Sequence, residues 1–255
     1  MLTSAEYDRL RRNLAEVRSQ IAAAAGRAGR SAHDVRLVAV TKYVARDVIG
    51  ALVELGVPDV GESRVQQLVE RARRCGPAAT DWPGEAPTPA AGPRWHMIGH
   101  LQRNKVKPLL EVARIVHSLD SERLAEALER QAAAAGVCVD VLIEVNVPGE
   151  ASKTGIPASE VAALATCVGR HGHLRLRGLM TMAPYDPDPE HARPHFARLR
   201  ALLEDLRRKG VVGPQCVHLS MGMSQDYAVA VEEGATLVRV GSALFAGLPT
   251  SDPRG

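Results

Sequence analysis

Lys42 stands at the end of an apolar run, and its amine is the first group along the chain that is placed to do chemistry. The run "LVAVT", residues 37–41, is typical of a buried strand, and the helical pattern "YVARDVI" follows the lysine. A lysine is costly at the tip of a buried strand unless its charge reaches water or its amine reacts. Lysine amines form Schiff bases with carbonyl groups, and burial lowers their pKa enough to free the lone pair. Lys42 is therefore a candidate nucleophile, with a solvated loop lysine as the alternative.

Two short segments near the C-terminus suit a phosphate group. Ser220 and Gly222 follow one apolar run, and Gly241 and Ser242 follow the next. In a (β/α)₈ barrel, the loops after strands 7 and 8 offer backbone N–H groups to phosphates. A lysine amine and a phosphate cradle at one mouth would suit a small phosphorylated aldehyde or ketone. The alternative for the first segment is an ordinary strand–turn–helix with Ser224 as the helix N-cap.

An arginine, Arg239, lies inside the apolar run "LVRVG". A charged group in a central strand needs a partner or a ligand. His191 and His195 have a spacing that could bind a metal ion, but Pro194 and the lack of a nearby third ligand favour a solvated helix start. We therefore expect no metal site.

Eight apolar runs supply the elements that would position these residues. The predicted strands lie at 35–41, 59–61, 95–99, 115–119, 139–147, 174–182, 216–221 and 237–241. Helical stretches such as 121–136 and 192–210 separate them, the latter closing with a glycine stop signal. Strand–helix alternation predicts a parallel sheet, and eight units predict a closed (β/α)₈ TIM barrel. An open doubly wound sheet is the alternative, although no GxGxxG turn opens a helix.

Two segments lie outside this repeating unit. Residues 4–25 are predicted to form an extra N-terminal helix, because apolar residues recur with a helical period from Leu10 to Ile21. Residues 75–94 are rich in Pro, Ala and Gly without periodicity, which predicts a flexible insertion. We expect residues 1–255 to form one barrel domain that carries this insertion.

Composition narrows the class of protein. The net charge is +3 from 32 basic and 29 acidic residues, and aromatic residues make up 3%, which leaves few platforms for stacking nucleic-acid bases. The four cysteines are far apart and form no CxxC pair, so neither a disulfide framework nor a zinc site is expected. No segment is long and apolar enough for a signal or a membrane span. We expect a cytoplasmic, monomeric protein without nucleic-acid or membrane partners.

Taken together, the motifs resemble those of the pyridoxal-phosphate homeostasis proteins, which share the barrel of the alanine racemase N-terminal domain without its second domain. The matching segments are "VAVTK" at 38–42, "GES" at 61–63, "WHMIGHLQRNK" at 95–105, "SLDS" at 118–121, "IEVNVPGEASKTG" at 143–155, "RGLMTMAP" at 177–184, "HLSMGMSQD" at 218–226 and "VRVGSALF" at 238–245. The resemblance runs nearly from end to end and is far more specific than a lone short motif.

The resemblance implies a set of cofactor-binding residues. It implies that Lys42 carries pyridoxal 5′-phosphate (PLP) as an internal aldimine, and that Arg239 faces the pyridine nitrogen. Ser63 stands where the family commonly has Asn, so a contact near the ring is shortened or lost. The residues that would hold the phosphate are Ser220, Gly222, Gly241 and Ser242.

Arg239 and the chain length favour a carrier over an efficient enzyme. An arginine stays charged and only donates, so it favours an unprotonated ring nitrogen and weakens carbanion stabilisation. A barrel of about 250 residues fills this chain, and no dedicated second acid or base stands out. We expect a protein of intracellular PLP homeostasis that delivers the cofactor to apo PLP-dependent enzymes. The alternatives are a PLP-dependent amino-acid racemase of weak or narrow activity and a lysine-dependent aldolase acting on a sugar phosphate.

Overall fold

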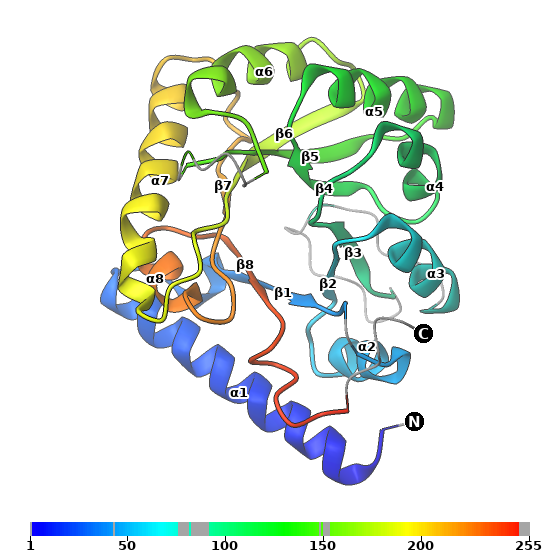
Figure 1. Ribbon diagram of the computed structural model, residues 1–255, viewed down its shortest axis with the longest axis vertical. Coiled ribbons are helices and arrows are strands. Elements are labelled where there is room, and N and C mark those ends of the chain that lie inside the picture. Colours follow the sequence, from blue (N-terminus) through cyan, green and yellow to red (C-terminus); the bar gives the residue numbers. More distant parts are fainter. Residues whose placement is uncertain are drawn as a thin grey trace.

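Eight parallel strands form a closed barrel in sequence order, with helices around its outside (Figure 1). The computed structural model describes residues 2–42, 44–75, 82, 92–147, 149 and 154–249. The strands are β1 (Arg36–Val40), β2 (Asp59–Glu62), β3 (Arg94–Met97), β4 (Ile115–Leu119), β5 (Val139–Glu144), β6 (Leu174–Met180), β7 (His218–Ser220) and β8 (Leu237–Val240). The closed barrel confirms the predicted (β/α)₈ fold and excludes the open sheet.

Helices lie between the strands as this architecture requires. The α-helices are α1 (Ser4–Arg27), α2 (Arg46–Glu54), α3 (Val65–Cys75), α4 (Val106–Leu110), α5 (Glu122–Ala135), α6 (Val161–Val168), α7 (Arg193–Arg208) and α8 (Tyr227–Glu232). Short 3₁₀ helices are η1 (Ala32–Asp34), η2 (Arg103–Lys105), η3 (Ala158–Glu160) and η4 (Pro189–Ala192). Each predicted strand corresponds to an observed one, with its ends shifted by at most three residues.

The pairing of the first strand with the last closes the barrel. β1 runs parallel to β8, from Arg36 opposite Leu237 to Ala39 opposite Val240. β4 and β5 are buried along their whole length, as expected for strands covered on both faces. Because all eight strands point the same way, their carboxyl ends gather at one mouth of the barrel.

The inside of the barrel is of mixed polarity. Val38, Leu142, Met180 and Leu237 form an apolar cluster separate from the large core, and Trp82 packs against it. Other interior positions carry buried polar side chains, which need hydrogen-bond partners because water does not reach them. These include His96, His117, Ser220 and Arg239.

The N-terminal helix α1 packs beside α8 and confirms the predicted extra helix (Figure 1). Thr3 and Glu6 form a capping box that satisfies backbone N–H groups at its start. Asn13 Nδ2 donates to the carbonyl oxygens of Leu244 and Ala246 at 2.9 and 3.0 Å. These hydrogen bonds therefore tie the segment that follows β8 to α1.

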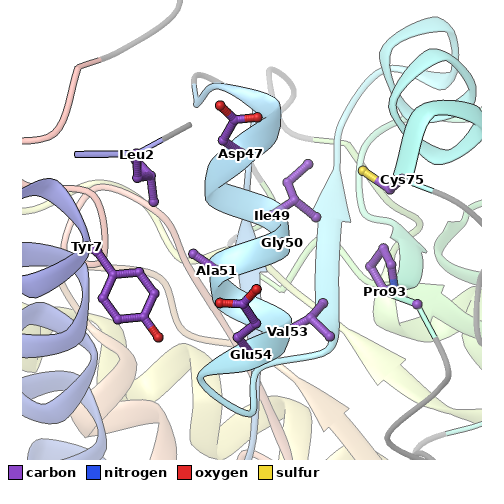
Figure 2. Close-up of a pocket in the computed structure, with 11 residues that line it drawn as sticks. Leu2, Tyr7, Asp47, Ile49, Gly50, Ala51, Val53, Glu54, Cys75 and Pro93 are labelled. Atoms are coloured by element: carbon purple, nitrogen blue, oxygen red, sulfur yellow. The ribbon is translucent and has the colours of Figure 1, made fainter. Parts of the chain in front are cut away.

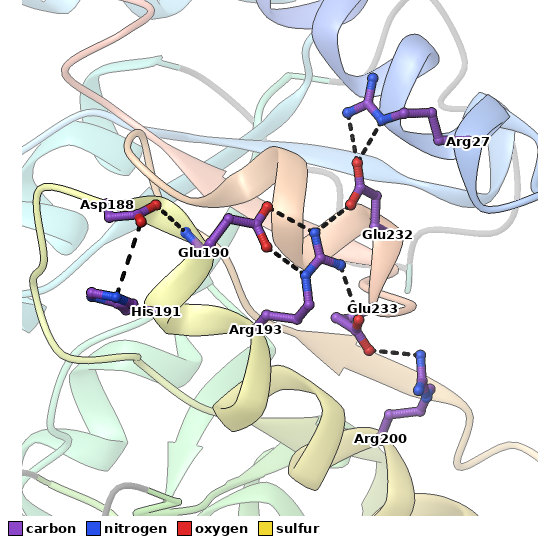
Figure 3. Close-up of polar contacts among 8 residues, drawn as sticks. All are labelled: Arg27, Asp188, Glu190, His191, Arg193, Arg200, Glu232 and Glu233. Carbon is purple, nitrogen blue, oxygen red and sulfur yellow. Dashed lines mark hydrogen bonds and ion pairs between the residues drawn. The ribbon is translucent and has the colours of Figure 1, made fainter.

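Ion pairs tie α1 and α7 to the end of α8 (Figure 3). Arg193 of α7 contacts Glu232 at 2.6 Å and Glu233 at 3.0 Å. The same guanidinium contacts Glu190 at 2.7 Å. Glu232 also contacts Arg27 of α1 at 2.6 Å. Arg193 and Arg27 thus share one carboxylate, which links three helices.

Trp82 lies at the amino-terminal end of the barrel, opposite the mouth. Its Nε1 donates to Nε2 of His218, the first residue of β7, at 3.0 Å. The guanidinium of Arg177 lies 5.4 Å from the Trp82 ring centroid. Residues 76–81 and 83–91 lie outside the described residues, so the flexible insertion at 75–94 stays a prediction.

The described helices also bear on membrane association. Within the described residues, none of the helices combines the length and the apolar character that crossing a membrane requires.

Candidate functional site

Lys42 lies at the mouth of the barrel, two residues beyond the end of β1, with an exposed side chain. Since Ala39 of β1 pairs with Val240 of β8, the loop after β8 lies beside it. A Cβ atom on Gly241 would lie only 3.1 Å from the carbonyl oxygen of Val40. The predicted nucleophile and the predicted phosphate loop therefore leave the barrel on neighbouring strands.

Two backbone N–H groups after β8 converge on one oxygen. The N–H groups of Gly241 and Ala243 donate to Ser224 Oγ at 3.2 and 3.3 Å. Ser224 belongs to the loop after β7, so its hydroxyl joins the two loops. A charged phosphate oxygen accepts such N–H groups more strongly than a hydroxyl does. Ser242 is exposed between the two donors, and the turn is therefore a cradle suited to an anion.

Gly222 allows the loop after β7 to fold back onto α8. Its φ of +92° disfavours other residues, and an added Cβ would lie 2.5 Å from the Cβ of Ala230. Its carbonyl oxygen accepts the backbone N–H of Arg239 at 3.0 Å. A larger residue at this position would displace the loop that carries Ser224.

Ser220 and Arg239 meet inside the barrel. Arg239 Nη1 donates to Ser220 Oγ at 2.7 Å, and Nη2 donates to the carbonyl oxygen of Thr181 at 2.9 Å. Both side chains are buried, with exposed fractions of 0% for Ser220 and 3% for Arg239. The Ser220 hydroxyl, which the resemblance assigns to the phosphate, thus lies against the arginine.

The Arg239 guanidinium stays charged although it is buried. Burial lowers its pKa to about 10, while the negative charges of Asp226 and Glu144 act in the opposite direction. Since arginine has five N–H groups and no acceptor, the side chain offers only donors to a ligand.

Glu62, the last residue of β2, brings a buried carboxyl close to Lys42. Thr41 Oγ1 and Arg71 Nη1 donate to its Oε1 at 2.7 and 2.8 Å. Its Oε2 is buried without a hydrogen-bond partner among the described residues. Burial raises the pKa of Glu62, and the positive charges of Arg71 and Lys42 oppose this shift. The carboxyl is an acid–base group that can exchange protons nearer to neutrality than an ordinary glutamate.

Ser63 follows Glu62 at the mouth and is partly exposed. A Cβ on Gly99 would lie 2.4 Å from the carbonyl oxygen of Ser63, so the loops after β2 and β3 touch. This contact fixes the backbone of Ser63 next to the site.

Sequence reasoning missed two of these groups. Ser224 follows the same strand as Ser220, but the sequence assigns it no contact with the phosphate and offers it only as a possible helix N-cap. In the sequence, Glu62 stands only as the middle residue of the matching segment "GES" at 61–63. A sequence signal for Glu62 exists, because it directly precedes Ser63 in a segment flanked by apolar residues.

A cavity of about 680 Å³ lies elsewhere, on the outside of the barrel against α2 (Figure 2). Tyr7 of α1 and Leu2, which precedes that helix, border it on one side of α2, and Cys75 and Pro93 border it on the other. None of the predicted site residues is among the described residues that line it. The candidate site is therefore the mouth and not this groove.

Comparisons with known proteins agree with the fold and the motifs. The model of the alanine racemase N-terminal domain matches residues 7–249. The pyridoxal phosphate homeostasis protein of Aquifex aeolicus is 39% identical over 232 residues, which cover 91% of this chain and 95% of the relative.

Two solved structures are similar over nearly the whole chain. A crystal structure of an unknown protein from Bifidobacterium adolescentis is 36% identical with a TM-score of 0.85, and the match covers 96% of this chain and 98% of the other. PipY of Synechococcus elongatus, solved with PLP bound, is 28% identical with a TM-score of 0.76, and the match covers 93% of this chain and 100% of PipY.

Proposed function

This chain belongs to the family of the pyridoxal phosphate homeostasis proteins, and we propose that it holds pyridoxal 5′-phosphate on Lys42 and takes part in homeostasis and delivery of that cofactor. The PLP-bound structure of PipY supports the choice of ligand. One observation carries the proposal: Lys42 and the N–H groups of Gly241 and Ala243 leave the barrel on neighbouring strands at the same mouth.

The covalent link depends on Lys42. The cofactor supplies an aldehyde, with which the neutral amine of Lys42 condenses to a Schiff base as one water is lost. Lys42 must first lose a proton, and Glu62 lies close enough for the charges of the two side chains to interact. Glu62 Oε2 has no hydrogen-bond partner among the described residues. We assign to this oxygen the role of accepting the lysine proton.

The phosphate is assigned to the turn after β8. With the cofactor bound, the N–H groups of Gly241 and Ala243, which contact Ser224 Oγ in this structure, would donate to the phosphate instead. The hydroxyls of Ser224 and Ser242 would add further hydrogen bonds to it. Gly222 keeps the loop after β7 close enough for Ser224 to take part. Ser220 contributes indirectly, because its hydroxyl accepts a hydrogen bond from Arg239 and holds that side chain in place.

Arg239 is assigned to the ring nitrogen of the cofactor. Its guanidinium donates and stays charged, so the ring nitrogen keeps its lone pair and withdraws electrons weakly. This favours a protein that stores the cofactor over one that turns over amino acids efficiently. We further propose that it works in the cytoplasm as a monomer and hands PLP to apo PLP-dependent enzymes.

An absorbance spectrum tests the proposal. Purified protein mixed with PLP should show the visible band of the lysine-bound cofactor, and borohydride should abolish the band and fix the label on Lys42. Lys42→Ala should remove the band while the circular dichroism of the barrel is unchanged. Lys107→Ala, an exposed lysine on α4, is the matched control and should keep the band. A full band in Lys42→Ala, or a label on another lysine, contradicts the assignment.

A further inference from the structure

A row of buried polar side chains crosses the inside of the barrel from one end to the other. We call these five residues the relay: Asp59 at the start of β2, His96 of β3, His117 of β4, Ser220 at the end of β7 and Arg239 of β8. Each of them is at most 3% exposed. The link from His117 to Ser220 joins β4 to β7, which are separated in the barrel by β5 and β6. The relay therefore passes through the interior and not along the wall.

Every link of the relay has the length of a hydrogen bond. The separations are 2.9 Å from Asp59 Oδ1 to His96 Nε2, 2.9 Å from His96 Nδ1 to His117 Nε2, 2.8 Å from His117 Nδ1 to Ser220 Oγ and 2.7 Å from Ser220 Oγ to Arg239 Nη1.

A guanidinium only donates and a carboxylate only accepts, so one consistent direction of hydrogen bonds runs from Arg239 to Asp59. Ser220 Oγ accepts from Arg239, and in this arrangement it donates its own hydrogen to Nδ1 of His117. With Nδ1 unprotonated, the neutral His117 carries its hydrogen on Nε2 and donates it to His96. By the same reasoning, His96 donates from Nε2 to the carboxylate of Asp59. One arrangement of hydrogens thus satisfies every member of the relay.

Charge holds this arrangement at both ends. Burial keeps the pKa of His117 well below its usual value, and the positive charge of Arg239 acts in the same direction, so His117 is neutral. At the other end, burial acts to raise the pKa of Asp59, but the hydrogen bond from His96 and the charge of Arg94 lower it to about 2. Arg94 Nη1 lies 2.8 Å from Asp59 Oδ1. A fixed anion and a fixed cation therefore enclose two neutral imidazoles and a hydroxyl.

We propose that the relay is a positioning device, in which the carboxylate and the two imidazoles act through Ser220 to hold Arg239 in the orientation that donates to the ring nitrogen of the cofactor. The proposal rests on the proposed function, because it assumes that the ring nitrogen of PLP would accept a hydrogen bond from Arg239. If Ser220 loses its acceptor at His117, its hydroxyl can rotate, so that only the bond to the Thr181 carbonyl oxygen still holds the guanidinium in a fixed orientation. The ring nitrogen would then lose a fixed donor, although every group that touches the cofactor is still present.

The first arm of the test uses the full-length protein without cofactor. Nitrogen NMR with isotope-labelled histidine reports which ring nitrogen carries the hydrogen. We expect both His96 and His117 to be neutral at about pH 7, with the hydrogen on Nε2. Detection of an imidazolium, or of a hydrogen on Nδ1 of either residue, overturns the relay. This arm remains informative even if PLP does not bind, so failure of the proposed function is recognised separately.

The second arm uses protein loaded with PLP that is isotope-labelled at its ring nitrogen. His117→Phe removes the acceptor of Ser220, and Asp59→Asn removes the anionic end. In both variants we expect the ring-nitrogen resonance to move towards that of free PLP at the same pH. His117→Asn should keep the wild-type resonance, because its amide oxygen can accept from Ser220 where Nδ1 did.

A matched control separates positioning from loss of structure. Asp140 is buried and pairs with Arg177 at 2.5 Å, but it does not belong to the relay. Asp140→Asn should lower stability and leave the ring-nitrogen resonance unchanged. If Asp59→Asn does not fold, His117→Phe and His117→Asn carry the comparison. An unchanged resonance in His117→Phe with PLP still bound to Lys42 overturns the proposal and leaves the proposed function intact.

Discussion

Ser224 is proposed to donate a hydrogen bond from its hydroxyl to the phosphate at the mouth. Its hydroxyl accepts the N–H groups of Gly241 and Ala243. We predict that Ser224→Ala weakens PLP binding on the order of 10- to 100-fold, because a hydrogen bond to a charged group contributes about 1.5–3 kcal/mol. Titration of the protein with PLP, followed by the absorbance of the bound cofactor, gives the affinity.

Pyridoxal without its phosphate is the control ligand for this prediction. It lacks the group that Ser224 would contact, so wild type and Ser224→Ala should bind it equally. An equal loss of affinity for pyridoxal and for PLP would place the effect of Ser224 outside the phosphate cradle.

His218 predicts a dependence of stability on pH. Burial and the charges of Arg177 and Arg36 lower the pKa of His218 to about 4, whereas a histidine in the unfolded chain titrates at about 6.5. Between these values the unfolded chain binds more protons than the folded one. The free energy of unfolding should therefore fall as pH decreases from about 6.5 to about 4, by up to about 1.4 kcal/mol per pH unit from this residue.

His218→Gln should remove this contribution, since glutamine does not titrate and its amide oxygen can accept from Trp82. Urea unfolding at several pH values measures the slope, and Trp82 fluorescence should change on acidification in wild type alone. His33→Gln, at an exposed histidine, is the control and should retain the wild-type slope. A slope unaffected by His218→Gln would contradict the prediction.

At the scale of elements, Arg193 joins α7 to α8 and shares Glu232 with α1. We predict that Arg193→Gln lowers the free energy of unfolding by about 1 kcal/mol, at the upper end for partly exposed ion pairs. Denaturant unfolding measures the change, and amide exchange in α1 should become faster. Arg208→Gln breaks an exposed pair with Asp205 within α7 and should have almost no effect. Equal losses in the two variants would show that the link between helices adds nothing.

The strands and helices could be predicted because the pattern of apolar and polar residues that indicates them lies within short stretches of sequence. The run "LVAV" at 37–40 is apolar and is bounded by Arg36 and Thr41, so its burial can be inferred from neighbours in the sequence. Several strand ends were predicted too long, since apolar residues continue into the loops: the run predicted at 139–147 ends as a strand at Glu144.

The polar site was predictable only in part. Lys42, Gly241 and Arg239 stand out by residue type at strand ends or inside strands. The relay could not be inferred, because His117 and Ser220 are 103 residues apart in sequence and meet only across the closed barrel. For the same reason, sequence could not show that the Ser220 hydroxyl is engaged by Arg239.

At the scale of the whole molecule, the cofactor should stabilise the fold. With PLP bound at the mouth of the folded barrel, as proposed, the fold should gain about 2.7 kcal/mol at 100 times the dissociation constant. For a chain of this size we expect Tm to rise by roughly 5–10 °C. Differential scanning calorimetry measures the shift, and Lys42→Ala should show a much smaller one. A shift of the same size in Lys42→Ala would mean that the covalent link adds nothing to retention.

The molecule should also be a poor catalyst. On the proposal that Arg239 donates to the ring nitrogen and leaves it unprotonated, we predict turnover of common amino acids well below the ordinary range of about 1–10³ per second. Racemisation assays with the PLP-loaded protein measure the rate. A rate within that range would favour the amino-acid racemase instead.

The pairing of β1 with β8 has a consequence for synthesis on the ribosome. Arg36 emerges about 200 residues before its partner Leu237, which at 5–20 residues per second is an interval of roughly 10–40 s. Throughout that interval, the edge of β1 that pairs with β8 and the apolar face of α1 that packs on α8 lack these native partners. Contacts between such distant segments also form slowly. The nascent chain therefore exposes the most unpaired strand edge and apolar surface just before its synthesis is complete. A chaperone that covers these surfaces would have its largest effect at that stage.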